Sequence, residues 1–197
     1  MNTRSSLGRA LPLVCLLSFY SCAPSPTAPG DTINPGAEYK ANVSSLYSSA
    51  GEGIEIKWKD SLGEIHALSE YKGTVVVVTF WRTNDIPSQQ QIAATDSLAT
   101  VMGDSVRAIG IAYVNVPLSH TFQVVSDYVQ KHGIKIQIIA DSLRLAQVQF
   151  AQSADNGLYM PETFIIKPSG DIADGGYLEG GGYSVADLQA WVRKAYK

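Results

Sequence analysis

Residues Thr74 to Trp81 read TVVVVTFW, a continuous run of β-branched and aromatic side chains. Such side chains favour strands. Because no charged residue alternates with the apolar ones, the run indicates a strand buried on both faces, as parallel strands are. We therefore expect residues 74–81 to form a central strand, with the rest of the domain arranged around it.

Downstream of this strand, helical and strand-like patterns alternate. Ile92, Leu98 and Val101 fall on one side of a helix expected over residues 88–102, and Gly103 is suited to end it. The following segments predict a strand over 106–113, a helix over 121–132, a strand over 134–140 and a short helix from Asp141 or Ser142 through Phe150. This order is typical of a βαβ unit with an extra helix and strand.

The last part of the chain predicts a hairpin and a closing helix. Strands are expected over 163–167 and 172–178, joined by a turn. Ser184 and Asp187 form a capping box before a helix with a clear apolar face. Gly180-Gly181-Gly182 is interpreted as a turn, because no Lys-Ser/Thr follows as in a phosphate loop. A βαβ half joined to a ββα half makes a mixed sheet with helices on both faces.

Upstream of the central strand, the sequence predicts a further hairpin. Ile54, Ile56 and Trp58 alternate in the manner of a half-buried strand. A turn over 60–63 and a partner strand over 65–68 follow. We expect this hairpin to be an N-terminal extension of the sheet.

The N-terminus carries the pattern of an export signal. Arg4 and Arg9 precede the apolar run 11–20, which is too short to span a bilayer. The segment Ser18-Phe19-Tyr20-Ser21-Cys22 resembles a bacterial lipoprotein cleavage site, with Cys22 as the lipidated first residue of the mature protein. Residues 1–21 are therefore expected to be a signal peptide. The alternatives are secretory cleavage nearby or an uncleaved anchor.

Residues 22–50 are rich in Pro, Ser, Ala and Gly and show no hydrophobic periodicity. Such a segment cannot bury enough apolar surface to offset the entropy of ordering it. We expect a flexible tether over 22–50, with a short helix around Tyr39 to Tyr47 as the alternative, and a folded domain over 51–197. The expected location is the bacterial cell envelope, at the outer membrane or the periplasmic face.

Composition excludes several classes of function. The 197-residue chain has a net charge of −3 and no Lys/Arg cluster, which argues against a nucleic-acid partner. Its two cysteines, Cys15 and Cys22, both precede the expected domain, so that domain contains no thiol. No two of His66, His120 and His132 have metal-ligand spacing. We expect neither a metal nor a cofactor.

Two segments carry a family resemblance. Leu68 to Thr83 (LSEYKGTVVVVTFWRT) resembles the segment that leads into the Cys-x-x-Cys motif of membrane-anchored, thioredoxin-like disulfide reductases of the TlpA type and the related AhpC-TSA-like redoxins. Met160 to Gly170 (MPETFIIKPSG) resembles their V-P-T-T-F-L-I-D-x-x-G motif. The resemblance covers residues 53–197. It implies an α/β thioredoxin-like fold, with a mixed central sheet flanked by helices and an N-terminal hairpin extension.

The resemblance breaks at the active-site motif. The family's two cysteines fall on Asp85 and Ser88 of Asp85-Ile86-Pro87-Ser88. Thiol–disulfide exchange and peroxide reduction both need a nucleophilic thiolate, which neither a carboxylate nor a hydroxyl supplies. No catalytic residue is therefore expected. Asp85 and Ser88 either cap the helix that opens at this position or contact a ligand.

Pro161 matches the position of the family's cis-proline, beside which relatives bind substrate peptides in a strand-like manner. If that site is kept, Trp81, Asp85, Met160 and Pro161 form a peptide-docking surface without chemistry. The alternative is that Pro161 serves only the turn.

Three functions follow from these observations. The first is a lipid-anchored, non-catalytic module that binds a protein or peptide partner around Asp85 and Met160. The second is the thiol–disulfide oxidoreductase or peroxidase activity that the family suggests, which the absence of cysteine disfavours. The third is an architectural envelope lipoprotein without a defined pocket.

Overall fold

The computed structural model describes residues 43–48, 54–114, 118–141, 145–146, 150 and 159–197. Its strands are β1 (Val43–Ser48), β2 (Lys57–Lys59), β3 (Ile65–Ala67), β4 (Val75–Trp81), β5 (Val106–Ala112), β6 (Gln137–Ala140), β7 (Glu162–Ile166) and β8 (Ile172–Glu179). Its α-helices are α1 (Ile86–Met102), α2 (Leu118–His132) and α4 (Val185–Ala195). The 3-10 helix η1 (Leu68–Tyr71) lies between β3 and β4, and η2 (Gly103–Ser105) lies between α1 and β5.

The strands form one mixed sheet in the order β3-β2-β1-β6-β5-β4-β7-β8. β1, β6, β5 and β4 are parallel neighbours, whereas β7 and β8 continue antiparallel on the other side of β4. Every residue of β4 is buried, because β4 has a neighbour on each side and packed layers above and below. The central strand, the βαβ unit and the closing ββα half that the sequence predicts are all confirmed.

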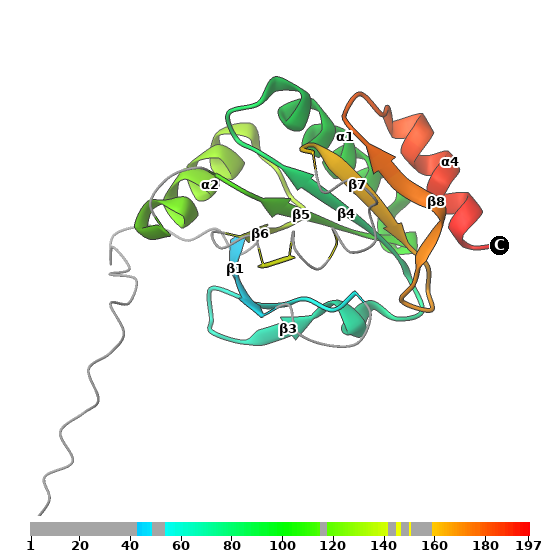
Figure 1. Cartoon of the computed structure of the whole chain (residues 1–197), viewed down its shortest axis with the longest axis horizontal. Coiled ribbons are helices and arrows are strands. Elements are labelled where there is room, and N and C mark those ends of the chain that lie inside the picture. Colours follow the sequence, from blue (N-terminus) through cyan, green and yellow to red (C-terminus); the bar gives the residue numbers. More distant parts are fainter. Residues whose placement is uncertain (1–42, 49–53, 115–117, 142–144, 147–149, 151–158) are drawn as a thin grey trace, which may run out of the picture. The chain divides into compact units, whose positions relative to one another are not determined.

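The side chains of β4 alternate between two layers. Val75 and Val77 pack with α1 and α4, and Trp81 packs with α2, so these three helices cover one face of the sheet (Figure 1). Val76, Val78 and Phe80 face the opposite layer, to which the antiparallel β2–β3 hairpin contributes. The N-terminal hairpin extension predicted from the sequence is therefore present.

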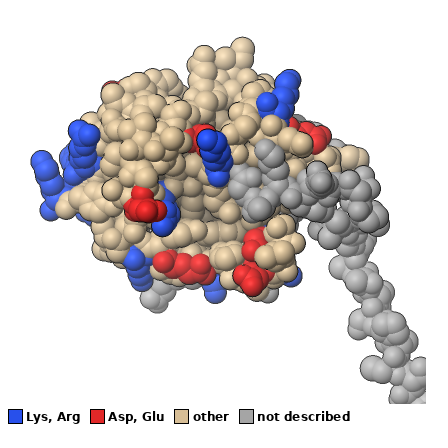
Figure 2. Space-filling view, turned by 180° about the vertical axis from the view of Figure 1, so that it is seen from behind, with Lys and Arg blue, Asp and Glu red and all other residues tan. Residues whose placement is uncertain are grey.

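The surface shows no gathering of one charge on the face drawn in Figure 2, where basic and acidic side chains are interspersed. Among the residues that the structure describes, no helix combines the length and the apolar character needed to cross a bilayer.

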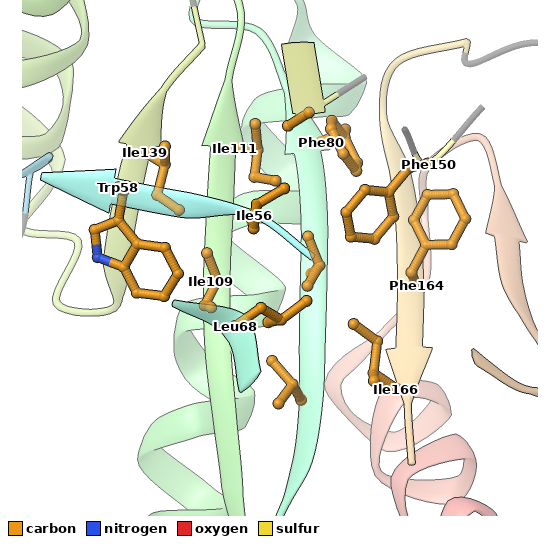
Figure 3. Close-up of a cluster of buried hydrophobic side chains, with 13 residues drawn as sticks. Ile56, Trp58, Leu68, Phe80, Ile109, Ile111, Ile139, Phe150, Phe164 and Ile166 are labelled. Carbon is orange, nitrogen blue, oxygen red and sulfur yellow. The ribbon is translucent and has the colours of Figure 1, made fainter. Parts of the chain in front are cut away.

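The layer on the β2–β3 hairpin side of the sheet contains a group of aromatic side chains in mutual contact (Figure 3). The rings of Phe80, Phe150 and Phe164 meet edge to face, with centroid separations of 4.9–5.8 Å. Phe150 and Ala146 come from the segment expected to be a short helix, and both are fully buried against this layer. Most of that segment lies outside the described residues. Asp141 accepts hydrogen bonds from the N–H groups of Leu145 and Ala146, as expected of its capping residue.

One boundary was wrong. The tether was expected to run to residue 50, but Val43–Ser48 forms β1, whose Val43 is fully buried. β1 lies parallel to β6, with Val43 opposite Ile138, and antiparallel to β2. The segment has little hydrophobic pattern of its own, so its partners on both sides decide its conformation. A strand also replaces the short helix considered there. Residues 1–42, with the expected signal peptide and Cys22, lie outside the described part of the chain.

Candidate functional site

Asp85, which the sequence resemblance aligns with the family's first cysteine, caps α1. Its Oδ2 accepts a hydrogen bond from the Ser88 N–H at 2.9 Å, and the helix begins at Ile86, two residues earlier than expected. Pro87 occupies the first turn of α1. Backbone N–H groups there have no partner within the helix, so the lack of an N–H in proline costs no helical hydrogen bond. The Gln89 side chain donates to Thr83 O at 2.7 Å and fixes the preceding loop. The capping role considered for Asp85 is therefore present.

Ser88, at the position of the second cysteine, is fully buried. Its hydroxyl has no hydrogen-bond partner among the described residues, whereas its N–H donates to Asp85. Because no base in the described part of the chain accepts a proton from Ser88 Oγ, this geometry does not activate it as a nucleophile. A surface partner cannot reach it either.

Three segments distant in sequence meet beside Pro87. The Met160–Pro161 peptide bond is cis. A Cβ placed on Gly181 would lie 2.9 Å from Pro161 Cγ and 3.3 Å from Pro87 Cβ, so only glycine lets this loop pack against both prolines. Gln91, in α1, anchors the same loop by accepting the Tyr183 N–H at 3.1 Å. We call the meeting point of residues 85–87, 159–161 and 181 the three-segment surface.

This surface exposes apolar side chains. Ile86 is 68% exposed and Tyr159 is 64% exposed, which are large fractions for such residues. Met160 is half-buried and packs on the aromatic layer, the cluster that contains Phe80, Phe150 and Phe164. Ile86 and Tyr159 belong to the two segments whose prolines meet at Gly181, and exposed apolar patches are typical of binding sites. The three-segment surface is therefore the candidate site, and its residues include no cysteine or serine.

Trp81 does not belong to this surface, and its assignment to partner binding was wrong. Its side chain is fully buried and packs on Tyr128, with ring centroids 5.0 Å apart. The alternation of β4 turns Trp81 inward, beneath α1 and α2.

Glu162 was missed. It follows Pro161 directly and is fully buried. Its Oε1 accepts the Tyr159 N–H at 2.6 Å and the Tyr177 O–H at 2.7 Å. Burial raises the pKa of Glu162 above its ordinary value, an effect that these two hydrogen bonds oppose. The position after the cis-proline was the one signal in the sequence. Gly181 was also missed as a site residue. A run of glycines predicts a turn, but it does not indicate which other segments pack against that turn.

A second cluster of ionisable groups lies on the β2–β3 hairpin. Ligand atoms of Asp60, Glu64 and His66 lie within 4.8 Å of one another. His66 Nε2 lies 3.2 Å from Asp60 Oδ2, and Nδ1 lies 3.4 Å from Glu70 Oε2. The Asp60 contact raises the pKa of His66. Hydrogen bonds between His66 and the carboxylates of Asp60 and Glu70 account for this cluster, which a search for paired histidines could not find.

Comparisons with known proteins agree with the fold. The sequence pattern of the AhpC/TSA family matches residues 52–174, more than half of the chain. Among curated proteins, none matches this sequence.

Several solved structures are similar. A thiol:disulfide interchange protein of the thioredoxin family from Chlorobium tepidum has 21% identity and a TM-score of 0.58, over 81% of this chain and 97% of that one. A DsbF homologue from Corynebacterium diphtheriae has 19% identity and a TM-score of 0.57, over 81% and 94%. A secreted Mycobacterium tuberculosis disulfide oxidoreductase has 13% identity and a TM-score of 0.55, over 70% and 93%.

Proposed function

The chain belongs to the AhpC/TSA family, and within that family we propose that it is a non-catalytic thioredoxin-like module that binds an extended segment of a partner polypeptide. The partner lies on the three-segment surface. In this proposal, the protein binds its partner at the place where the resemblance puts the family's substrate site, but it carries out no thiol chemistry there.

The observation that carries the proposal is the pairing of a changed motif with an exposed apolar surface. Asp85 and Ser88 stand where thiol chemistry would need cysteines, and the sequence has cysteine only at positions 15 and 22. Ile86 and Tyr159 nevertheless remain exposed beside Pro161. Leaving such side chains in water is unfavourable, so a partner that covers them accounts for their presence.

An extended segment fits this surface better than a folded partner's flat face. The surface consists of one helix start, one segment before β7 and one glycine loop. Extended peptides bind such places through main-chain hydrogen bonds and alternate side chains. Apolar side chains of the partner would pack on Ile86 and Tyr159.

The proposed location is the cell envelope, with Cys22 as the lipid anchor. The N-terminal signal pattern supports this location. The similar disulfide oxidoreductase from Mycobacterium tuberculosis is itself a secreted protein. Mass spectrometry of protein purified from membranes tests the anchor, since a mature N-terminus at an acylated Cys22 is expected. An intact residue 1 would contradict it.

The binding experiment uses the full-length chain and a labelled, carboxymethylated insulin B chain as an extended, thiol-free probe. Ile86→Glu and Tyr159→Glu should each weaken binding about tenfold, because each places a charge on an apolar contact. An acid at the first helical position suits the helix dipole, so Ile86→Glu should fold.

Val101→Lys is the matched control. Val101 is 62% exposed near the other end of α1, and a cation suits that end. Equal weakening by all three variants would contradict the proposal, and so would binding unchanged in all of them. No binding by the unaltered protein would favour an architectural role.

The family's redox activity is the alternative function. It requires turnover in insulin-reduction or peroxide-consumption assays. We expect the protein to show none, because Asp85 and Ser88 cannot exchange disulfides. Turnover that persists after Cys15→Ser and Cys22→Ser would overturn the non-catalytic assignment.

A further inference from the structure

Glu162 is a buried acid whose charge has no role in the backbone pairing of β7. It is the first residue of β7, opposite Phe80 of β4 and Glu179 of β8. Oε1 accepts two hydrogen bonds, while Oε2 has no partner among the residues that the structure describes. Burying an ionisable carboxyl without full pairing costs free energy, and a neutral side chain would avoid that cost. Groups kept in such environments concentrate at functional sites.

The hydrogen bond to Tyr159 connects this carboxyl to the surface. The Tyr159 N–H donates inward to Oε1 at 2.6 Å, while the Tyr159 side chain is 64% exposed. Fixing the amide fixes the direction in which the ring leaves the backbone. The adjacent Met160 is held between this bond and the aromatic layer on which it packs.

A second bond ties the carboxyl to the neighbouring strand. The Tyr177 O–H donates to the same Oε1 at 2.7 Å, and Tyr177 packs on Phe164, with ring centroids 5.1 Å apart. The carboxyl therefore joins the segment before β7 to β8 at a single oxygen. A change in its charge acts on both bonds together.

We propose that Glu162 is the positioning residue of the three-segment surface: its ionised carboxylate holds the Tyr159–Met160 segment in the shape that receives the partner. Binding therefore strengthens as Glu162 loses its proton. This inference rests on the proposed function, because it specifies how that same surface is regulated.

The groups around Glu162 determine where the change occurs. In the described part of the chain, the titratable groups that face it are Tyr159 on its own segment and Tyr177 and Glu179 on β8. Burial raises the pKa of Glu162 above 4.5, and Glu179 raises it further, against the two hydrogen bonds. A carboxylate accepts hydrogen bonds about twice as strongly as a neutral group. The surface is therefore held firmly above this raised pKa and loosely below it.

The experiment measures two quantities on the full-length chain between about pH 8 and pH 4. The first is affinity for the carboxymethylated insulin B chain, which should weaken about tenfold on acidification. The second is the NMR shift of the Tyr159 amide without probe, which should follow the same midpoint. In Glu162→Gln, both should lose this pH dependence, because the amide keeps an acceptor but does not titrate.

Tyr177→Phe is the second variant. It removes one hydrogen bond from the carboxylate, so both midpoints should move to higher pH. A purely structural role of Glu162 would lower stability in Glu162→Gln without removing a titration step.

The outcomes separate the two proposals. If the unaltered protein binds the probe but neither affinity nor the Tyr159 shift depends on Glu162, the positioning role is wrong and the docking function stands. If the Tyr159 shift titrates with Glu162 but the probe never binds, the docking function is wrong, and regulation of partner binding fails with it.

Discussion

Two groups of buried polar side chains lie close together around α1, and they differ in how completely they are hydrogen-bonded. Deep in the domain, the hydroxyl of Thr79 lies 2.8 Å from that of Thr95 and 3.1 Å from that of Thr163. Thr95 also donates to Gln91 O at 3.0 Å. Every hydroxyl of this cluster has a partner, as is usual for buried polar groups.

The end of the sheet next to Asp85 differs. Here the buried atoms without a partner in the described residues lie on the end of β4, the loop after it, the first turns of α1 and the start of β7; they are Trp81 Nε1, Arg82 Nε, Ser88 Oγ, Gln91 Nε2 and Glu162 Oε2. One other such atom, Thr121 Oγ1, belongs to α2.

β7 brings the two groups next to each other, since Thr163 is fully bonded on one face and Glu162 is half-bonded on the other. Proteins depart from complete pairing mainly at functional sites. Asp85 and Ser88 stand where the resemblance places the family's cysteines, and the incompletely bonded atoms lie around them in the described residues. Under the proposed function, these atoms border the binding surface.

Returning the thiols gives the largest expected effect. Asp85→Cys with Ser88→Cys, in a chain that also carries Cys15→Ser and Cys22→Ser, should acquire insulin-reducing activity where the unaltered protein has none. The helix N-terminus at this position stabilises a thiolate. Asp85→Cys alone, in the same Cys15→Ser and Cys22→Ser background, is the control, because without a second thiol at position 88 its mixed disulfide is not resolved. An inactive double variant that folds normally would show that the site geometry has been lost.

Thr79→Val breaks the fully bonded group. It keeps the shape of the side chain but removes the hydroxyl shared by Thr95 and Thr163. The expected loss is about 1–3 kcal/mol of unfolding free energy, because buried partners are left unsatisfied. Urea denaturation measures this loss. If Thr79→Val were as stable as the unaltered protein, the hydrogen bonds of the threonine cluster would not contribute to stability, and the difference between the two groups would not hold.

Glu162→Gln is expected to raise stability at neutral pH by a smaller amount. Because burial raises the pKa of Glu162 in the folded state above 4.5, the proton stabilises the fold. This stabilisation by the proton is complete below the ordinary pKa of glutamate and is lost as pH rises through the raised pKa of the folded state. The variant should therefore gain at pH 7 and lose its advantage in acid. Unfolding curves at both pH values test the sign, and an advantage that grows in acid would contradict it.

Ser88→Ala should have the smallest effect. Its hydroxyl is fully buried and has no partner in the described ranges, so its removal should leave stability within about 1 kcal/mol or raise it. The capping bond uses the Ser88 N–H, which alanine keeps. Comparison with Thr79→Val under the same urea conditions sharpens the contrast between the two groups.

Local pattern was sufficient for the elements that carry their own signal. The run 74–81 predicted β4, and the capping box at Ser184 predicted the start of α4, where Ser184 and Asp187 bond as expected. β1 was missed because its stability comes from β6 and β2 on either side. Trp81 was misplaced because a strand buried on both faces gives no sign of which face is close to the surface.

By itself, the sequence determined the fold, the presence of Asp85 and Ser88 where the resemblance places cysteines, and capping of the helix as one of two roles open to Asp85. These features depend on residue type and on neighbours close in the chain. Only the tertiary structure decided that Gly181 packs on Pro87 and Pro161 and that Glu162 lies buried behind Tyr159. Those contacts join segments that the sheet topology brings together, and periodicity along one segment carries no information about the distance to another.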